Sequence, residues 1–241
     1  MTGFAGRAVA FLLALSLATP AWARPVGYAG GWILNADTGD GGSNVEVMYT
    51  PAARVAVGVR AEHNRPLDHD FAGAALNLVV FRHNAPDSQA NLYLTGAAGV
   101  ATGRYVVPTA LTGPLSIHAA HLAAINGLAP GPVLRFRRAA GSLGAQADWE
   151  SRRFLVLAEA RGMTIDTQGS TLMYRGRVGV APYVAESGAL HTWLILQAEH
   201  NDFAKRDITV TPLVRLFKGT TLVEVGSSLQ GRLLATVWLY F

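Results

Sequence analysis

The sequence has no cysteine and few charged residues. The missing cysteine excludes a disulfide framework, a thiolate metal site, a cysteine nucleophile and a lipoprotein lipid-attachment residue. Charged residues make up 15% of the chain, whereas an ordinary soluble protein has about 25%. Lysine and arginine form no run and the formal net charge is only +4, so we expect no nucleic acid partner. Phosphate-loop, dinucleotide-binding and EF-hand motifs are also missing, and we expect no cofactor.

Long apolar runs are absent too, although 50% of the residues are hydrophobic. No segment reaches the ~20 consecutive apolar residues that a membrane-spanning helix needs. The apolar excess must therefore be spread over short segments. Strands that turn one face toward lipid would use it in this way.

The N-terminal residues have the composition of an export signal. Arg7 precedes an apolar run over residues 8–18, which only one serine interrupts, and Ala21-Trp22-Ala23 follows as a small-x-small cleavage site. This pattern predicts a cleaved signal peptide over residues 1–23 and a mature chain over residues 24–241.

The mature chain breaks into short segments in which apolar and polar residues alternate, and turn-forming residues separate the segments. About twelve strands are predicted, at residues 28–34, 43–49, 55–62, 74–81, 91–100, 143–150, 154–161, 170–180, 192–200, 208–217, 220–227 and 233–241. Most gaps that follow even-numbered strands are shorter than those that follow odd-numbered strands, which is typical of bacterial outer-membrane barrels. We therefore predict an all-β, antiparallel transmembrane β-barrel, with residues 101–141 as a long extracellular loop or insertion.

The alternation also predicts which side chains face the barrel interior, because successive residues of a strand point to opposite faces. Val57 and Val59 share one face of the third segment, for example, while Arg60 shares the other with Glu62. Both signs of charge occur on the interior face, so we expect ion pairs there. The predicted lumen charges are Glu46, Arg60, Glu62, Asp148, Glu150, Glu159, Arg161, Arg175, Arg177, Glu199, Arg215 and Glu224.

The chain ends in an alternating apolar segment whose last residue is Phe241. This ending resembles the C-terminal strand by which outer-membrane proteins of Gram-negative bacteria are recognised for assembly, and Phe241 would be the terminal residue of that signal. The implied partners are the assembly machinery and outer-membrane lipid. Trp238 and Tyr240 are predicted to be aromatic residues at the membrane interface.

Three further segments carry a family resemblance, namely residues 88–94, 181–184 and 211–224. They are similar to a group of uncharacterised proteobacterial exported proteins, outside the 101–141 segment. The resemblance implies an outer-membrane barrel and no particular activity.

Histidines suggest a possible metal site. The tetrapeptide Ala-Glu-His-Asn occurs at residues 61–64 and again at 198–201, which places His63 and His200 at the loop ends of two strands, and His69 lies in an Asp-His-Asp sequence. Imidazole and carboxylate groups are suitable ligands for Zn²⁺ or Cu²⁺. The alternative is that these polar side chains simply suit the membrane interface.

Enzymatic motifs are missing, and we do not expect an enzyme. The sequence has no Gly-x-Ser-x-Gly and no His-Glu-x-x-His. Ser116 and His118 lie close together in the sequence and are the candidate residues of a hydrolase, although loop polar residues are the alternative interpretation. Three functions stay open: a small channel or structural barrel with a polar lumen, a barrel that binds a metal ion or small solute at its outer loops, and an outer-membrane hydrolase.

Overall fold

The computed structural model describes residues 24–106, 133–166, 168–186, 188–202 and 208–241. The predicted signal peptide, 1–23, lies outside the described residues. Twelve strands are present in the described part of the chain: β1 (Trp32–Gly39), β2 (Gly42–Ala52), β3 (Val55–Asn64), β4 (His69–Ala85), β5 (Ser88–Val106), β6 (Val133–Ser151), β7 (Phe154–Ile165), β8 (Gly169–Val180), β9 (His191–Asn201), β10 (Thr209–Lys218), β11 (Thr221–Ser227) and β12 (Leu233–Tyr240).

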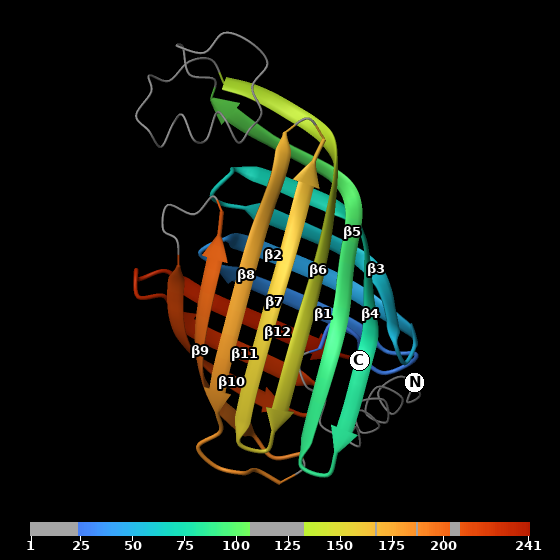
Figure 1. Cartoon of the computed structure of the whole chain (residues 1–241), viewed down its shortest axis with the longest axis vertical. Coiled ribbons are helices and arrows are strands. Elements are labelled where there is room, and N and C mark those ends of the chain that lie inside the picture. The colour runs from blue at the N-terminus through green and yellow to red at the C-terminus, as the bar shows by residue number, and fades with distance from the viewer. Residues whose placement is uncertain (1–23, 107–132, 167, 187, 203–207) are drawn as a thin grey trace, which may run out of the picture.

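Each strand pairs antiparallel with its neighbours in sequence, and β1 pairs with β12, so the sheet closes into a barrel (Figure 1). At the closure, the Trp32 amide donates to the carbonyl of Phe241 at 2.6 Å, and the Phe241 amide donates back at 3.0 Å. Closure pairs the first strand with the last, so neither of them forms a free sheet edge. The described residues include no helix with the length and hydropathy of a membrane span. The predicted antiparallel barrel of twelve strands is confirmed.

The two ends of the barrel differ. Arg24, the C-terminus and the tight turns after β2, β4, β6 and β10 lie at one end, which we call the terminal end. The connections after the odd-numbered strands lie at the other, which we call the loop end.

The segment at 101–141 is only partly a loop, so the prediction is wrong at both ends of this range. β5 continues through Val106 and β6 begins at Val133, and the two stay paired over that whole length. Figure 1 shows them running past the other strands and bending there. The alternation is weak here because alanine and glycine occupy both faces. Residues 107–132 lie outside the described part of the chain.

The outward face of the barrel is apolar along most strands. Val59 on β3 is 60% exposed and Leu143 on β6 is 70% exposed. Other exposed apolar side chains are Val45, Val57, Leu76, Leu94, Val156, Leu172, Val178, Leu194, Leu196, Val214, Leu216, Val225 and Val237. Exposed apolar surface on this scale exceeds what a soluble monomer shows, and it has the form of a belt suited to lipid.

A charge placed in this belt should impair folding into a membrane. We expect Val59→Arg to destabilise the barrel in lipid vesicles by about 2–4 kcal/mol, because Val59 lies mid-strand on the outward face, where the bilayer centre would be. His63→Arg, on the same face of β3 but at its loop end, should cost about 0–1 kcal/mol. Urea titration of the refolded barrels measures both. Equal costs at the two positions would contradict a membrane belt.

Candidate functional site: the barrel lumen

The structure places all twelve predicted lumen charges on the interior face of their strands. Their neighbours along each strand point outward, because the side chains alternate. In β8, for example, Arg175 and Arg177 face inward, while Tyr174 and Val178 are exposed on the outside. The interior is therefore lined by carboxylates and guanidinium groups inside an apolar exterior.

Glu224 on β11 lies at the centre of the most buried ion cluster. Arg215 on the paired strand β10 donates from Nε to its Oε1 at 2.7 Å, and Arg177 on β8 reaches its Oε2 at 3.1 Å. The Glu224 side chain is 1% exposed. Arg177 also donates to Gln197 at 2.7 Å. An isolated carboxylate would be costly at this depth, and two guanidinium groups offset that cost.

Other arginines join strands on both sides of the lumen. Arg175 lies between Glu199 at 2.9 Å and Glu159 at 3.3 Å, on the two strands that flank its own. Arg161 on β7 reaches Glu62 on β3 at 2.7 Å. Because β3 and β7 are four strands apart in the barrel order, this pair crosses the interior. The Arg161 and Glu62 side chains together are long enough to join these two walls.

Glu46 on β2 makes a third cluster. Its Oε2 accepts hydrogen bonds from Nη2 of Arg60 at 2.9 Å and from Nε at 3.1 Å, and its Oε1 accepts one from Asn77 at 2.8 Å. All three side chains are buried. Three strands, β2, β3 and β4, are thereby joined, and both oxygens of the carboxylate accept hydrogen bonds.

Asp37 is a lumen residue that the sequence prediction missed. It lies on β1 and accepts hydrogen bonds from Asn44 at 3.0 Å and from Asn35 at 3.5 Å. The first strand was predicted to end at residue 34, whereas β1 runs to Gly39. The polar and small residues of that stretch are typical of a turn, so the sequence pattern does not indicate that the strand continues. The inward position of Asp37 follows only once the strand is known to extend to Gly39.

A cavity of about 200 Å³ occupies the lumen between these clusters. It extends from Pro25 and Met48 near the terminal end to Asp40 and Arg232 at the loop end. Its lining includes seven carboxylates and six arginines: Asp37, Asp40, Glu46, Glu62, Glu159, Glu199 and Glu224, with Arg60, Arg161, Arg175, Arg177, Arg215 and Arg232. The cavity is polar and close to electrically balanced.

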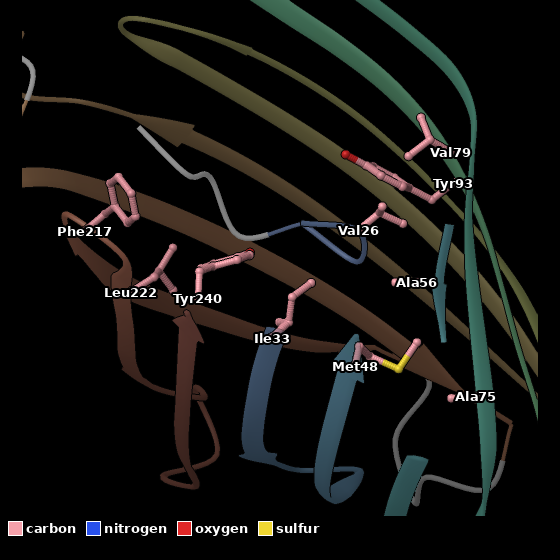
Figure 2. Packing of buried hydrophobic residues seen from close by; sticks show 10 residues of the cluster. All are labelled: Val26, Ile33, Met48, Ala56, Ala75, Val79, Tyr93, Phe217, Leu222 and Tyr240. Carbon is pink, nitrogen blue, oxygen red and sulfur yellow. The ribbon is translucent and has the colours of Figure 1, made fainter. Parts of the chain in front are cut away.

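The chain from Arg24 to Gly27 lies inside the terminal end of the lumen. Asn77 donates to the Pro25 carbonyl at 3.1 Å, and the Arg24 amide donates to the Tyr240 hydroxyl at 2.6 Å. Val26 is 2% exposed and packs in a cluster with side chains from eight strands (Figure 2). The other members are Ile33, Met48, Ala56, Ala75, Val79, Tyr93, Phe217, Leu222 and Tyr240. We call residues 24–27 the plug segment, because this end of the lumen is packed like a protein core.

A second apolar cluster lies toward the loop end. It consists of Phe71, Ala101, Phe136, Ala140, Met163 and Ile165, and it fills the side of the lumen formed by β4 to β7. The cavity lies beside this cluster and still reaches all twelve strands, since Asn77, Thr95, Gln146 and Glu159 on β4 to β7 also line it.

Two aromatic residues differ from the prediction. Tyr240 is 5% exposed and its hydroxyl contacts Arg24, and Trp238 packs on the same cluster as Val26. Both side chains therefore point into the lumen and are not at the membrane interface, because strand alternation places them opposite the face that holds Phe241. Phe241 is 55% exposed.

The structure does not bring the predicted metal ligands together. His63 contacts Asp70 at 2.9 Å and His200 contacts Asp202 at 3.2 Å, on β3 and β9, which are six strands apart in the ring. His69 is buried at the start of β4. Within the described ranges no group of three or more His, Cys, Asp or Glu residues is arranged to hold a metal ion. Ser116 and His118 lie outside the described residues.

No protein-family model matches the chain, and no curated protein matches it. Among solved structures, OccAB1 of Acinetobacter baumannii is similar over 83% of this chain with 9% identity and a TM-score of 0.40, and the chain spans 56% of that protein. OmpT, an outer membrane protein of Vibrio cholerae, is similar over 88% of this chain and 96% of its own, with 9% identity and a TM-score of 0.26. At such identities and TM-scores, the assignment of the fold rests on the strand order of this barrel itself: the protein is a closed antiparallel β-barrel of twelve strands.

Proposed function

We propose that this protein is an outer-membrane β-barrel that acts as a small channel for ions or small polar solutes, with a resting state closed by the plug segment. The observation that carries the proposal is the inverted distribution of polarity. Apolar side chains such as Val59 and Leu143 face outward, while buried charges such as Glu224 and Arg215 face a cavity. A soluble protein has the opposite arrangement.

The orientation follows from the two ends of the barrel. The tight turns and both ends of the mature chain suit the periplasmic side, and the longer connections suit the exterior. Phe241, which closes the β1–β12 seam through its backbone, would then be available to the assembly machinery from the periplasm before the barrel closes.

The small size of the lumen limits what could pass. The cavity of about 200 Å³ has room for a few water molecules or a small hydrated ion, and Arg161 and Glu62 cross it. Passage also requires the plug segment to move, since Val26 and its neighbours fill the terminal end.

Two measurements test this function. Membrane fractionation should recover the protein with the outer membrane, and planar-bilayer recording should show infrequent, small current steps. Because seven carboxylates and six arginines line the cavity, the reversal potential in a salt gradient should lie near zero. Recovery in the soluble periplasmic fraction would remove the membrane assignment. A complete lack of current at every voltage, with the plug segment intact or disrupted, would remove the channel.

A further inference from the structure

The extended tips of β5 and β6 concentrate positive charge on the outward face at the loop end. Arg104 pairs directly with Arg135 across the two strands, and Arg137 follows two residues later on the same face. All three are exposed. Like charges directly opposite each other on neighbouring strands are destabilising, so the arrangement calls for a counter-charge.

The counter-charge that the barrel itself supplies is incomplete. Asp68 pairs with Arg104 at 3.2 Å, and Asp70 pairs with His63 at 2.9 Å. Among the described residues, neither Arg135 nor Arg137 has an acidic partner. The residues that connect β5 to β6, 107–132, contain no aspartate or glutamate. Two guanidinium groups thus remain available to an external anion.

A surface groove of about 560 Å³ lies directly below these arginines on the outer wall of β2 to β6. Arg137, Thr102 and His63 line its upper part at one register level, since Arg137 pairs with Thr102, Thr102 with Asp70 and Asp70 with His63. The next outward level down is apolar and consists of Val45, Ala61, Ala72 and Val100. The groove therefore changes from basic and polar to apolar over one step of the strands.

We propose that this groove, called here the arginine groove, binds a phosphate-bearing lipid of the outer leaflet. The lipid phosphate lies between Arg135 and Arg137, and an acyl chain packs on the apolar level below them, against Val45, Ala61, Ala72 and Val100. Arginine binds phosphate through a planar fork of donors, and small side chains leave room for a chain at the wall. The inference rests on the proposed outer-membrane location.

The test uses the full-length protein expressed in its host, extracted from outer membranes in mild detergent and analysed by native mass spectrometry. We expect the wild-type protein to retain a phosphorylated lipid. The double variant Arg135→Gln/Arg137→Gln should bind it about thirtyfold more weakly, because each of the two basic residues near an anionic surface contributes on the order of 1 kcal/mol and about 1.4 kcal/mol is a factor of ten. Arg152→Gln/Arg153→Gln, which removes two exposed arginines at the terminal end, should behave like the wild type.

Rebinding separates the possible ligands. Protein stripped of lipid is titrated with lipid A, with lipid A lacking its phosphates, and with inorganic phosphate. Binding of phosphorylated lipid A alone supports the proposal. Equal binding of the dephosphorylated lipid, or binding of inorganic phosphate but no lipid, overturns it. If the double glutamine variant fails to assemble, the Arg135→Lys/Arg137→Lys variant takes its place, because it keeps both charges and loses the planar fork of donors. Unchanged lipid retention in this lysine variant and in the two single glutamine variants also overturns the proposal. A wild-type protein found outside the outer membrane would instead refute the proposed function.

Discussion

Val26→Asp should turn a barrel that is mostly closed into one that is mostly open in planar bilayers. Val26 is 2% exposed at the centre of the cluster that fills the terminal end of the lumen. Removing its burial costs the closed state about 1.5–3 kcal/mol, and an unpaired carboxylate among apolar side chains costs more. A change of about 1.4 kcal/mol shifts an equilibrium tenfold, so open probability should rise by about tenfold or more.

The matched control for this experiment is Ala29→Asp, which places the same charge three residues further along, where the side chain is exposed. It should record like the wild type. All three proteins are refolded from chains that begin at Arg24, so that signal cleavage does not enter the comparison. If Val26→Asp barrels fold normally, as gel mobility before and after heating would show, and yet open no more often than the wild type, the plug segment is not the closure.

Glu224→Gln should be the most destabilising single substitution among the lumen charges. Glu224 is 1% exposed and forms ion pairs with both Arg215 and Arg177. The substitution therefore removes the negative charge that these two buried guanidinium groups share. Breaking a buried ion pair by removing one partner costs about 3–5 kcal/mol. Urea unfolding of the refolded barrel, followed by tryptophan fluorescence, measures the loss.

Asp37→Asn is the comparison for Glu224→Gln. Asp37 also faces the lumen, but it accepts hydrogen bonds from the neutral amides of Asn44 and Asn35, which can hydrogen-bond to an asparagine as well. We expect this variant to lose much less stability than Glu224→Gln. A loss of the same size in both would mean that the arginine contacts of Glu224 contribute little to the stability of the barrel.

The faces of the strands were predictable from the sequence, because side-chain alternation is a local property that holds wherever a strand forms. Arg175 and Arg177 could be placed inside, and Tyr174 and Val178 outside, with no knowledge of neighbouring strands. The same rule placed Glu224 and Arg215 on the interior face. It failed where the pattern was weak, as in the stretch of β1 that holds Asp37 and in the alanine- and glycine-rich tips of β5 and β6.

Contacts across the interior were decided by the tertiary structure alone. That Arg161 meets Glu62, and that Arg177 meets Glu224, depends on how many strands close the barrel and how they are staggered, and no segment contains that information by itself. The same holds for Val26, whose position in the lumen results from packing against residues as distant in sequence as Tyr240. Local alternation thus determined the strands and their outward-facing and lumen-facing sides. Barrel closure decided which charges pair, where the lumen is blocked and where arginines meet an apolar groove.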